Sequence, residues 1–151
     1  MSIGLSVGQQ AVRNIAAAVA ATGTPAPVER TDTTEYTAAR LPAYNVFRKS
    51  DKIAFQGAHD SAECTFEVIV RAMVKAVSLG DEAVDPLVVW AWQTVMADRT
   101  LGGVVADAMI TGIEYSYVAK GEYDQLAADI TVEVKVDVDQ ADPTINKTYP
   151  S

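Results

Sequence analysis

Residues 129–139 read "DITVEVKVDVD" and carry the clearest pattern in the chain. Apolar and polar side chains alternate along the whole stretch, which is the period of two that a β-strand requires. The pattern predicts a long strand with one dry face and one charged, wet face. The dry face consists of Ile130, Val132, Val134, Val136 and Val138, and the wet face of Asp129, Thr131, Glu133, Lys135, Asp137 and Asp139.

Similar patterns elsewhere predict more extended chain. Residues 65–75 alternate in the same way and predict a half-buried strand. Residues 113–120, "IEYSYVAK", alternate as well, and "KGEYDQ" after them predicts a hairpin turn. Residues 28–55 are rich in Thr and Tyr with mixed polarity. This favours exposed strands or a long loop, interrupted at Pro42 and turned at "RKSDK".

Two stretches have helical spacing instead. Apolar residues at three- and four-residue steps predict a first helix over residues 6–22, which Gly23 and Pro25 would end. A second helix is predicted from Ser78 or Asp81 to about residue 98, with Pro86 favouring a regular part that starts only there. The mixed stretch "VVADAMITG", residues 104–112, predicts a helical turn.

Together these elements predict an α+β fold with a mainly antiparallel sheet and helices packed on one face. Residues 1–140 are expected to form a single domain. Residues 141–151, "ADPTINKTYPS", have proline and small polar residues without periodicity and are expected to form a C-terminal tail. The apolar N-terminal stretch lacks the basic opening of a secretory signal, so we expect a helix there.

Charge and hydropathy restrict the class of partner. The chain has 151 residues and a formal net charge of −8. This sign disfavours a protein that grips nucleic acid by neutralising phosphates. The uncharged apolar runs are shorter than the roughly 20 residues that a membrane-spanning helix needs, so no membrane partner is expected.

The sequence offers little evidence of site chemistry. "DRTLGG", residues 98–103, has adjacent glycines but neither the spacing nor the Lys of a phosphate-binding loop, and we expect it to be a joint between two elements. His59 and Cys64, close to Asp60 and Ser61, could form a catalytic arrangement, although the stretch is more typical of a surface loop. No catalytic residue, metal site or cofactor is expected.

The acidic and aromatic residues are expected to serve surfaces. The acids of residues 129–139 lie on the wet face of a strand, where solvated charge is the usual state. Trp90 and Trp92 cannot both point inward from one helix, because residues two apart differ by about 200° around the axis. One of them is therefore expected to face a partner or an adjoining loop.

Two stretches of the chain resemble a known protein family. "LPAYNVFRKSDKIAFQG" resembles the early extended segment of phage tail terminator and tail completion proteins, in which a strand runs into a charged loop. "DRTLGGVVADAMITGIEY" is similar to the turn of that family between its second helix and its closing strands. With the order of elements, the resemblance covers most of residues 5–139.

The resemblance implies a structural virion protein, assembled in the host cytoplasm and without catalysis. Such a subunit forms a homo-oligomer, a hexameric ring, on the head-proximal end of the tail tube. The ring ends tube polymerisation and offers the surface that docks to the head-neck connector protein. DNA would pass an acidic lumen without specific binding, because like charges deny it phosphate contacts.

Within this reading, two groups of residues are expected at interfaces. Glu133, Asp137 and Asp139 would contribute to the lumen or to a surface between rings. Arg48, Lys49 and Lys52 would contact an acidic neighbour, and Trp90 or Trp92 would face a partner. Two alternatives remain open: a head-tail connector or stopper of the phage neck, and a small ligand-binding or hydrolase domain that uses His59 and Cys64.

Overall fold

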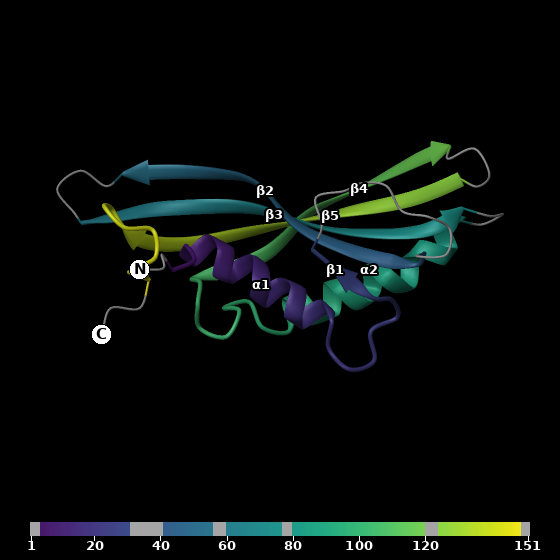
Figure 1. The fold of residues 1–151 in the computed structure, drawn as a ribbon, viewed down its shortest axis with the longest axis horizontal. Helices are drawn as coiled ribbons and strands as arrows, with labels where there is room; N and C mark the ends of the chain where they lie inside the picture. Colours follow the sequence, from purple (N-terminus) through teal and green to yellow (C-terminus); the bar gives the residue numbers. More distant parts are fainter. Residues whose placement is uncertain (1–3, 31–40, 56–59, 77–79, 120–123, 149–151) are drawn as a thin grey trace.

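The computed structural model describes residues 4–30, 41–55, 60–76, 80–119 and 124–148. A helix comes first, then three strands, a second helix and two closing strands (Figure 1). The five described strands form one sheet in the order β1-β2-β3-β5-β4, and only the short β1 runs parallel to its neighbour. The elements are α1 (Val7–Val19), β1 (Val28–Glu29), β2 (Ala43–Phe55), β3 (Ser61–Ala76), α2 (Gly80–Met96), β4 (Asp107–Ala119) and β5 (Asp124–Asp139).

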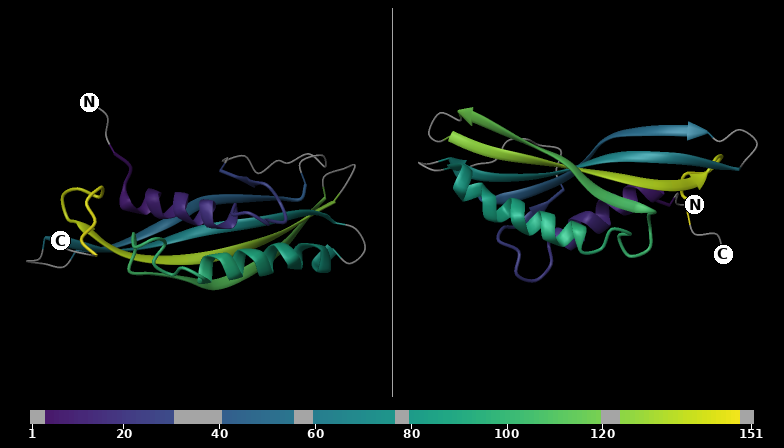
Figure 2. Two further views of the ribbon diagram at one scale, coloured as in Figure 1. Left: turned by 90° about the horizontal axis from the view of Figure 1, so that it is seen from below. Right: turned by 180° about the vertical axis from the view of Figure 1, so that it is seen from behind.

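Both helices lie side by side on one face of this sheet (Figure 2), which we call the helix face. The prediction of an α+β fold with a mainly antiparallel sheet and helices on one face is therefore confirmed. The even-numbered residues of β3 and β5 point to the helix face and form one core with both helices. The members of this core with no exposed surface include Val12, Ile15, Val68, Val70, Val84, Val95, Ile130 and Val132. The opposite face of the sheet is called the open face.

Two hydrogen bonds join the helices to the sheet and to each other. The buried Tyr44 hydroxyl on β2 donates to the Leu87 carbonyl of α2 at 2.5 Å, and burial raises the pKa of this tyrosine. The Trp90 indole on α2 donates to the Val19 carbonyl at the end of α1, at 2.8 Å. The second bond satisfies one of the carbonyls that a helix leaves unpaired at its C-terminus.

The predicted turn at residues 48–52 is wrong, because β2 runs through them. The register of β2 against β3 shifts between Arg48 and Ser50, which marks a β-bulge. A bulge adds one residue to a strand, so the side chains after it exchange faces. Tyr44 and Val46 point to the helix face before the bulge, and Ile53 and Phe55 do so after it.

Two further predictions are corrected in part. Helix α2 begins at Gly80, which agrees with the predicted start near Ser78 or Asp81 but not with a regular part that starts only at Pro86. Pro86 therefore lies inside the helix, where it omits the hydrogen bond that an amide at this position would make to the Glu82 carbonyl. The helical turn predicted for residues 104–112 is wrong from Asp107 onward, where β4 begins. Pairing with β5 overrides the weak local pattern there.

The described part of the C-terminal segment folds back onto the domain. The Asp139 amide donates to the Ile145 carbonyl, and the Lys147 amide donates to the Asp137 carbonyl. The Pro143 carbonyl accepts from the Val7 amide, which is one of the first amides of α1. This segment therefore supports both the end of β5 and the start of α1. None of the described helices is long and apolar enough to cross a membrane.

Gly8 lies where α1 approaches β2 and β3 closely, which leads to a prediction about stability. A Cβ at Gly8 would lie 2.7 Å from an Arg48 guanidinium nitrogen and 2.7 Å from the Phe66 ring. Helix propensity alone favours Ala by about 0.5–1 kcal/mol. We nevertheless expect Gly8→Ala to destabilise the protein by about 1–3 kcal/mol through overpacking, measured by urea unfolding. A matched Gly4→Ala control meets nothing within 4 Å. A Gly8→Ala variant as stable as this control would contradict the expectation.

Candidate functional site

The three cations predicted to form one patch lie on different faces of the sheet. Arg48 points to the helix face, where its guanidinium binds both carboxylate oxygens of Asp51 at 2.7 and 2.8 Å. It also donates to the Ser6 hydroxyl at 3.3 Å and stacks over the Phe66 ring. Lys49 lies 3.9 Å from the Glu67 carboxylate on the open face. Arg48 therefore takes part in packing, and the lysines remain exposed cations.

Of the predicted acids, Glu133 and Asp137 lie on the open face, whereas Asp139 lies at the end of β5 beside the turn that follows it. Glu133 lies 3.8 Å from the Lys135 ammonium on the same strand. Asp139 accepts the amides of the turn that follows β5, and it lies 3.9 Å from Lys147. Asp137 is held through its backbone amide, which donates to the Thr148 hydroxyl. Glu133 and Asp137 thus fit a common acidic surface better than Asp139, which supports the local turn.

The two tryptophans point in different directions, as the helical wheel requires. Trp90 is half-buried and bonded to α1. Trp92 has 48 % of its surface exposed, so it is the tryptophan that is available to a partner.

The residues of the predicted catalytic alternative are only partly described. His59 lies outside the described residues. Cys64 is buried, and its thiol lies 3.9 Å from the Ala62 carbonyl. Burial raises the pKa of this thiol, and the nearby carboxylate of Asp51 raises it further. A nucleophilic cysteine needs a lowered pKa, so the environment of Cys64 disfavours that role.

The "DRTLGG" segment connects α2 to β4. The Asp98 carboxylate accepts the Gly102 amide at 2.8 Å and the Thr100 hydroxyl at 3.0 Å, and these bonds hold the pKa of Asp98 below its usual range. Gly102 and Gly103 have φ values of 76° and 82°, which glycine adopts at little cost. Leu101 is buried, and its carbonyl accepts from the Asn14 side chain of α1. The segment is a joint that also contacts the first helix.

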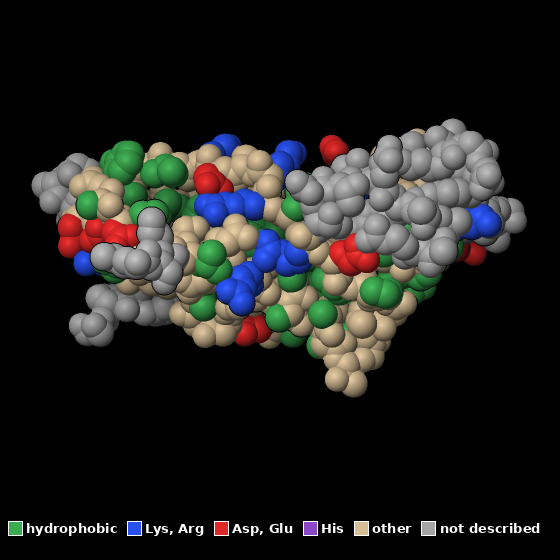
Figure 3. Space-filling view, in the orientation of Figure 1, with side chains coloured by type: hydrophobic (Ala, Val, Ile, Leu, Met, Phe, Trp, Pro, Cys, Tyr) green, Lys and Arg blue, Asp and Glu red, His purple; other side chains and the backbone are tan. Residues whose placement is uncertain are grey.

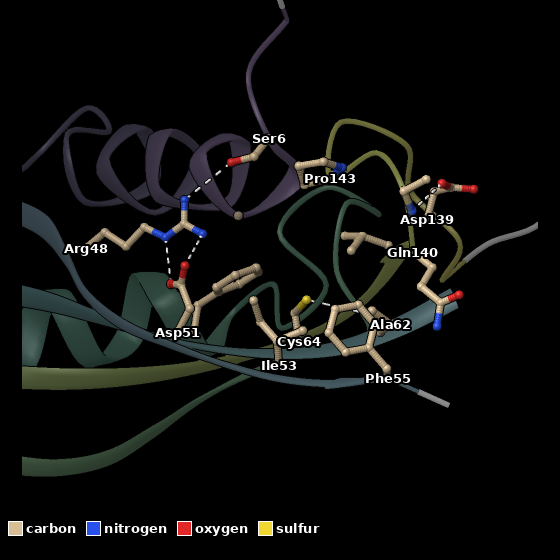
Figure 4. A pocket seen from close by; sticks show the side chains of 14 residues that line it. Ser6, Arg48, Asp51, Ile53, Phe55, Ala62, Cys64, Asp139, Gln140 and Pro143 are labelled. Carbon is tan, nitrogen blue, oxygen red and sulfur yellow. Dashed lines mark hydrogen bonds and ion pairs between the residues drawn. The ribbon is translucent and has the colours of Figure 1, made fainter. Parts of the chain in front are cut away.

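One groove opens on the helix face at the end where β2 and β3 extend beyond the helices. It has a volume of about 350 Å³ and lies between this strand end, the start of α1 and the turn after β5 (Figure 4). Ile53 and Phe55 point into it with 57 % and 65 % of their surfaces exposed, and the Arg48–Asp51 pair closes one end. Apolar side chains are visibly exposed at this end of the molecule (Figure 3). The exposed part of its lining is mainly apolar, with Arg48 and Asp51 at one end.

A second hollow, of about 380 Å³, lies on the open face. At its centre Arg71 makes two bonds to the Asp129 carboxylate, at 2.7 and 3.0 Å, and it stacks over the Phe47 ring. The ion pair bridges the two central strands, β3 and β5. Lys49 of β2 and Glu114 of β4 lie at the two rims.

The sequence prediction missed the exposed apolar residues at both edges of the sheet. Ile53 and Phe55 lie on the β2 edge, and Tyr115 and Tyr117 lie on the β4 edge with 54 % and 64 % of their surfaces exposed. The alternation in "DKIAF", residues 51–55, is the signal that could have revealed the first pair. Because a turn was predicted at residues 48–52, this alternation was not interpreted as part of a strand.

The described residues contain no group of three or more His, Cys, Asp or Glu that could hold a metal ion. No family model and no curated protein matches the chain.

The environment of Cys64 leads to a prediction about thiol reactivity. Because the thiol is buried and its pKa is raised, it should react much more slowly with Ellman's reagent at pH 8 in the folded protein than in urea. The neutral thiol is favoured by folding, so its contribution to stability is complete below the unfolded pKa of about 8.5 and is lost as the pH rises above it. Cys64→Ser supplies the blank. Equal rates with and without urea would contradict this assignment.

Asp98 leads to a prediction about acid stability. Its lowered pKa means that the ionised carboxylate stabilises the folded state above the unfolded pKa of about 3.9. This contribution is lost as the pH falls through the folded pKa. We expect Asp98→Asn to lower the melting temperature at pH 7, and the difference from the wild type to shrink below about pH 4. A pH-independent difference would mean that the charge has no role in the turn.

Proposed function

We propose that this chain is a phage tail terminator subunit, a structural virion protein that assembles into a ring on the head-proximal end of the tail tube. The sequence resemblance to tail terminator proteins is the starting point of this proposal. The observed order of elements agrees with it: a first helix, strands, a second helix, then two closing strands. The "DRTLGG" joint lies between the second helix and the closing strands, as the resemblance implies.

One observation carries the proposal: among the described strands, both edges of the sheet are largely without a pairing partner. β1 pairs with β2 only at Tyr44 and Asn45, and no described strand pairs with the outer edge of β2 beyond Asn45 or with the outer edge of β4. Open edges invite pairing with another chain. A contact between different surfaces of identical subunits closes into a ring when the rotation between neighbours allows it. The fold therefore supports ring assembly through two distinct sides of the subunit.

The charge distribution fits a ring that surrounds DNA. With a net charge of −8, the protein repels a polyphosphate, and Glu133 and Asp137 add carboxylates to the open face. A lumen lined by this face would let DNA slide without phosphate contacts. The head-neck connector would dock on the surface of the ring that faces the head.

The expected role of Arg48 at an interface is revised. Its contacts with Asp51, Ser6 and Phe66 make it part of the packing between α1 and the sheet. Charge reversal at Arg48 would therefore disturb the fold. Lys49 and Lys52 are exposed and remain the cations proposed to meet an acidic neighbour.

A connector or stopper of the phage neck is the second candidate, and it would share the open edges and the acidic charge. Its contact with the tube separates it from a terminator, because a terminator binds the end of the tube and a stopper binds the connector. The small hydrolase remains the alternative from another class. Loss of an activity on His59→Ala would favour it.

The test combines the purified protein with tail tube protein. We expect light scattering to give a mass of several subunits, and negative-stain microscopy to show rings that cap one end of each tube and shorten newly polymerised tubes. An unrelated acidic protein of similar size at equal concentration should leave tube length unchanged. A protein that has no effect on tube length and binds no tube end would contradict the terminator proposal. Binding to purified neck connectors alone would favour the stopper.

A further inference from the structure

We infer that neighbouring copies of this chain join their sheets edge to edge, with β4 of one copy antiparallel to residues 46–55 in β2 of the next. This inference rests on the proposed ring and names the surfaces that build it. The occupant of each open edge is a second copy of the same chain. Four observations support it: strand direction, strand length, charge and exposed apolar side chains.

Strand direction comes first. β2 is antiparallel to β3, β3 to β5, and β5 to β4, so β2 and β4 run in opposite directions within one copy. Copies that follow one another around a ring axis keep the same orientation relative to that axis. β4 of one copy therefore meets β2 of the next copy antiparallel, which is the slightly more stable pairing.

Strand length agrees with this arrangement. β4 spans 13 residues, and residues 46–55 are the part of β2 whose outer edge has no partner among the described strands. Along most of each edge no described strand pairs with the outward amide and carbonyl groups, so they can pair with another copy. In an antiparallel alignment, the hairpin end of β2 lies beside the start of β4, and the lysines of β2 fall near the middle of β4.

The charges of the two edges are complementary on the open face. Lys49 and Lys52 project from β2, with the same orientation as their neighbours Glu67 and Thr65 on β3. Glu114 projects from β4 to the same face, beside Asp129. Within the described part of the chain, neither Lys52 nor Glu114 has an ion pair. Opposite charges across paired strands stabilise the pairing, and like charges oppose it.

The exposed apolar side chains lie on the other face of the same edges. Ile53 and Phe55 of β2 and Tyr115 and Tyr117 of β4 all point to the helix face, next to even-numbered core positions of β3 and β5. Each pair is the apolar side of an edge strand that no described element covers. Edge pairing would place β4 of a neighbour beside Ile53 and Phe55, and it would remove apolar surface from water at both edges.

A charge swap tests the inference. The β2 variant carries Lys49→Glu and Lys52→Glu, and the β4 variant carries Glu114→Lys. Each alone places like charges across the joint, so we expect association to weaken by about tenfold or more in light scattering at low salt. Lys75→Glu is the matched control, because it reverses an exposed lysine on the inner strand β3 and should assemble as the wild type does.

Rescue gives the decisive result. We expect a chain with all three substitutions to assemble again, since each joint regains opposite charges. An equimolar mixture of the two variants should also assemble, with the copies alternating around an even-numbered ring. Hydrogen exchange should then protect β4 and residues 46–55 in the assembly relative to the dissociated subunit. Assembly of the mixture also shows that the β2 variant and the β4 variant both fold.

Three results would overturn the inference. These are assembly of both variants at wild-type concentrations, loss of assembly that neither the combined chain nor the mixture restores, and a wild-type protein that remains monomeric. The proposed function is judged separately by tube capping. Wild-type rings that cap tubes but ignore the charge swap would refute the edge pairing alone. Rings that obey the swap but leave tubes uncapped would refute the terminator role alone.

Discussion

The antiparallel ladder between β3 and β5 is the constraint on which the rest of the structure depends. It joins two 16-residue strands without a register shift, from Ser61 opposite Asp139 to Ala76 opposite Asp124. This register puts the valine-rich sides of both strands on the helix face, where α1 and α2 bury them. A slip of one residue would expose that entire apolar row. The Arg71–Asp129 ion pair lies within the same ladder and joins its two strands on the open face.

The outer strands owe their shape to two irregularities. β2 has a register shift between Arg48 and Ser50, and β4 has one between Ile110 and Gly112. The bulge in β2 returns Asp51 to the helix face, where it binds Arg48 from the other side of the shift. It also turns Ile53 and Phe55 to that face, where the helices leave them exposed. The groove and the exposed apolar edge therefore have a single local cause.

The sequence predicted the elements whose signal is periodic and missed those set by pairing. Residues 129–139 and 65–75 alternate strictly, because one face of each strand is buried and the other is polar, and both strands were predicted. "RKSDK" has the composition of a turn, and only its pairing with β3 shows that it is a bulged strand. The candidate site was predicted less well. The helical wheel predicted that Trp90 and Trp92 would differ in exposure, but not which of them is exposed. That Arg48 and Lys49 lie on different faces depends on the bulge, which one sequence does not reveal.

The position of Arg48 shows why exposed charge and interface charge must be distinguished in a protein of this kind. Its guanidinium joins the start of α1 to β2 and β3, since it contacts Ser6, Asp51 and Phe66, and it fills the space left by the absent side chain of Gly8. Replacing this arginine removes contacts within the fold, so a loss of assembly in such a variant does not by itself report on a contact between subunits. Lys52 has no such internal role among the described residues, so a change in assembly caused by its charge reports on a contact between subunits. Substitutions that test a contact between subunits therefore belong on the open face of the edge strands. There a charge can be reversed, and then compensated on the facing strand, without disturbing the core.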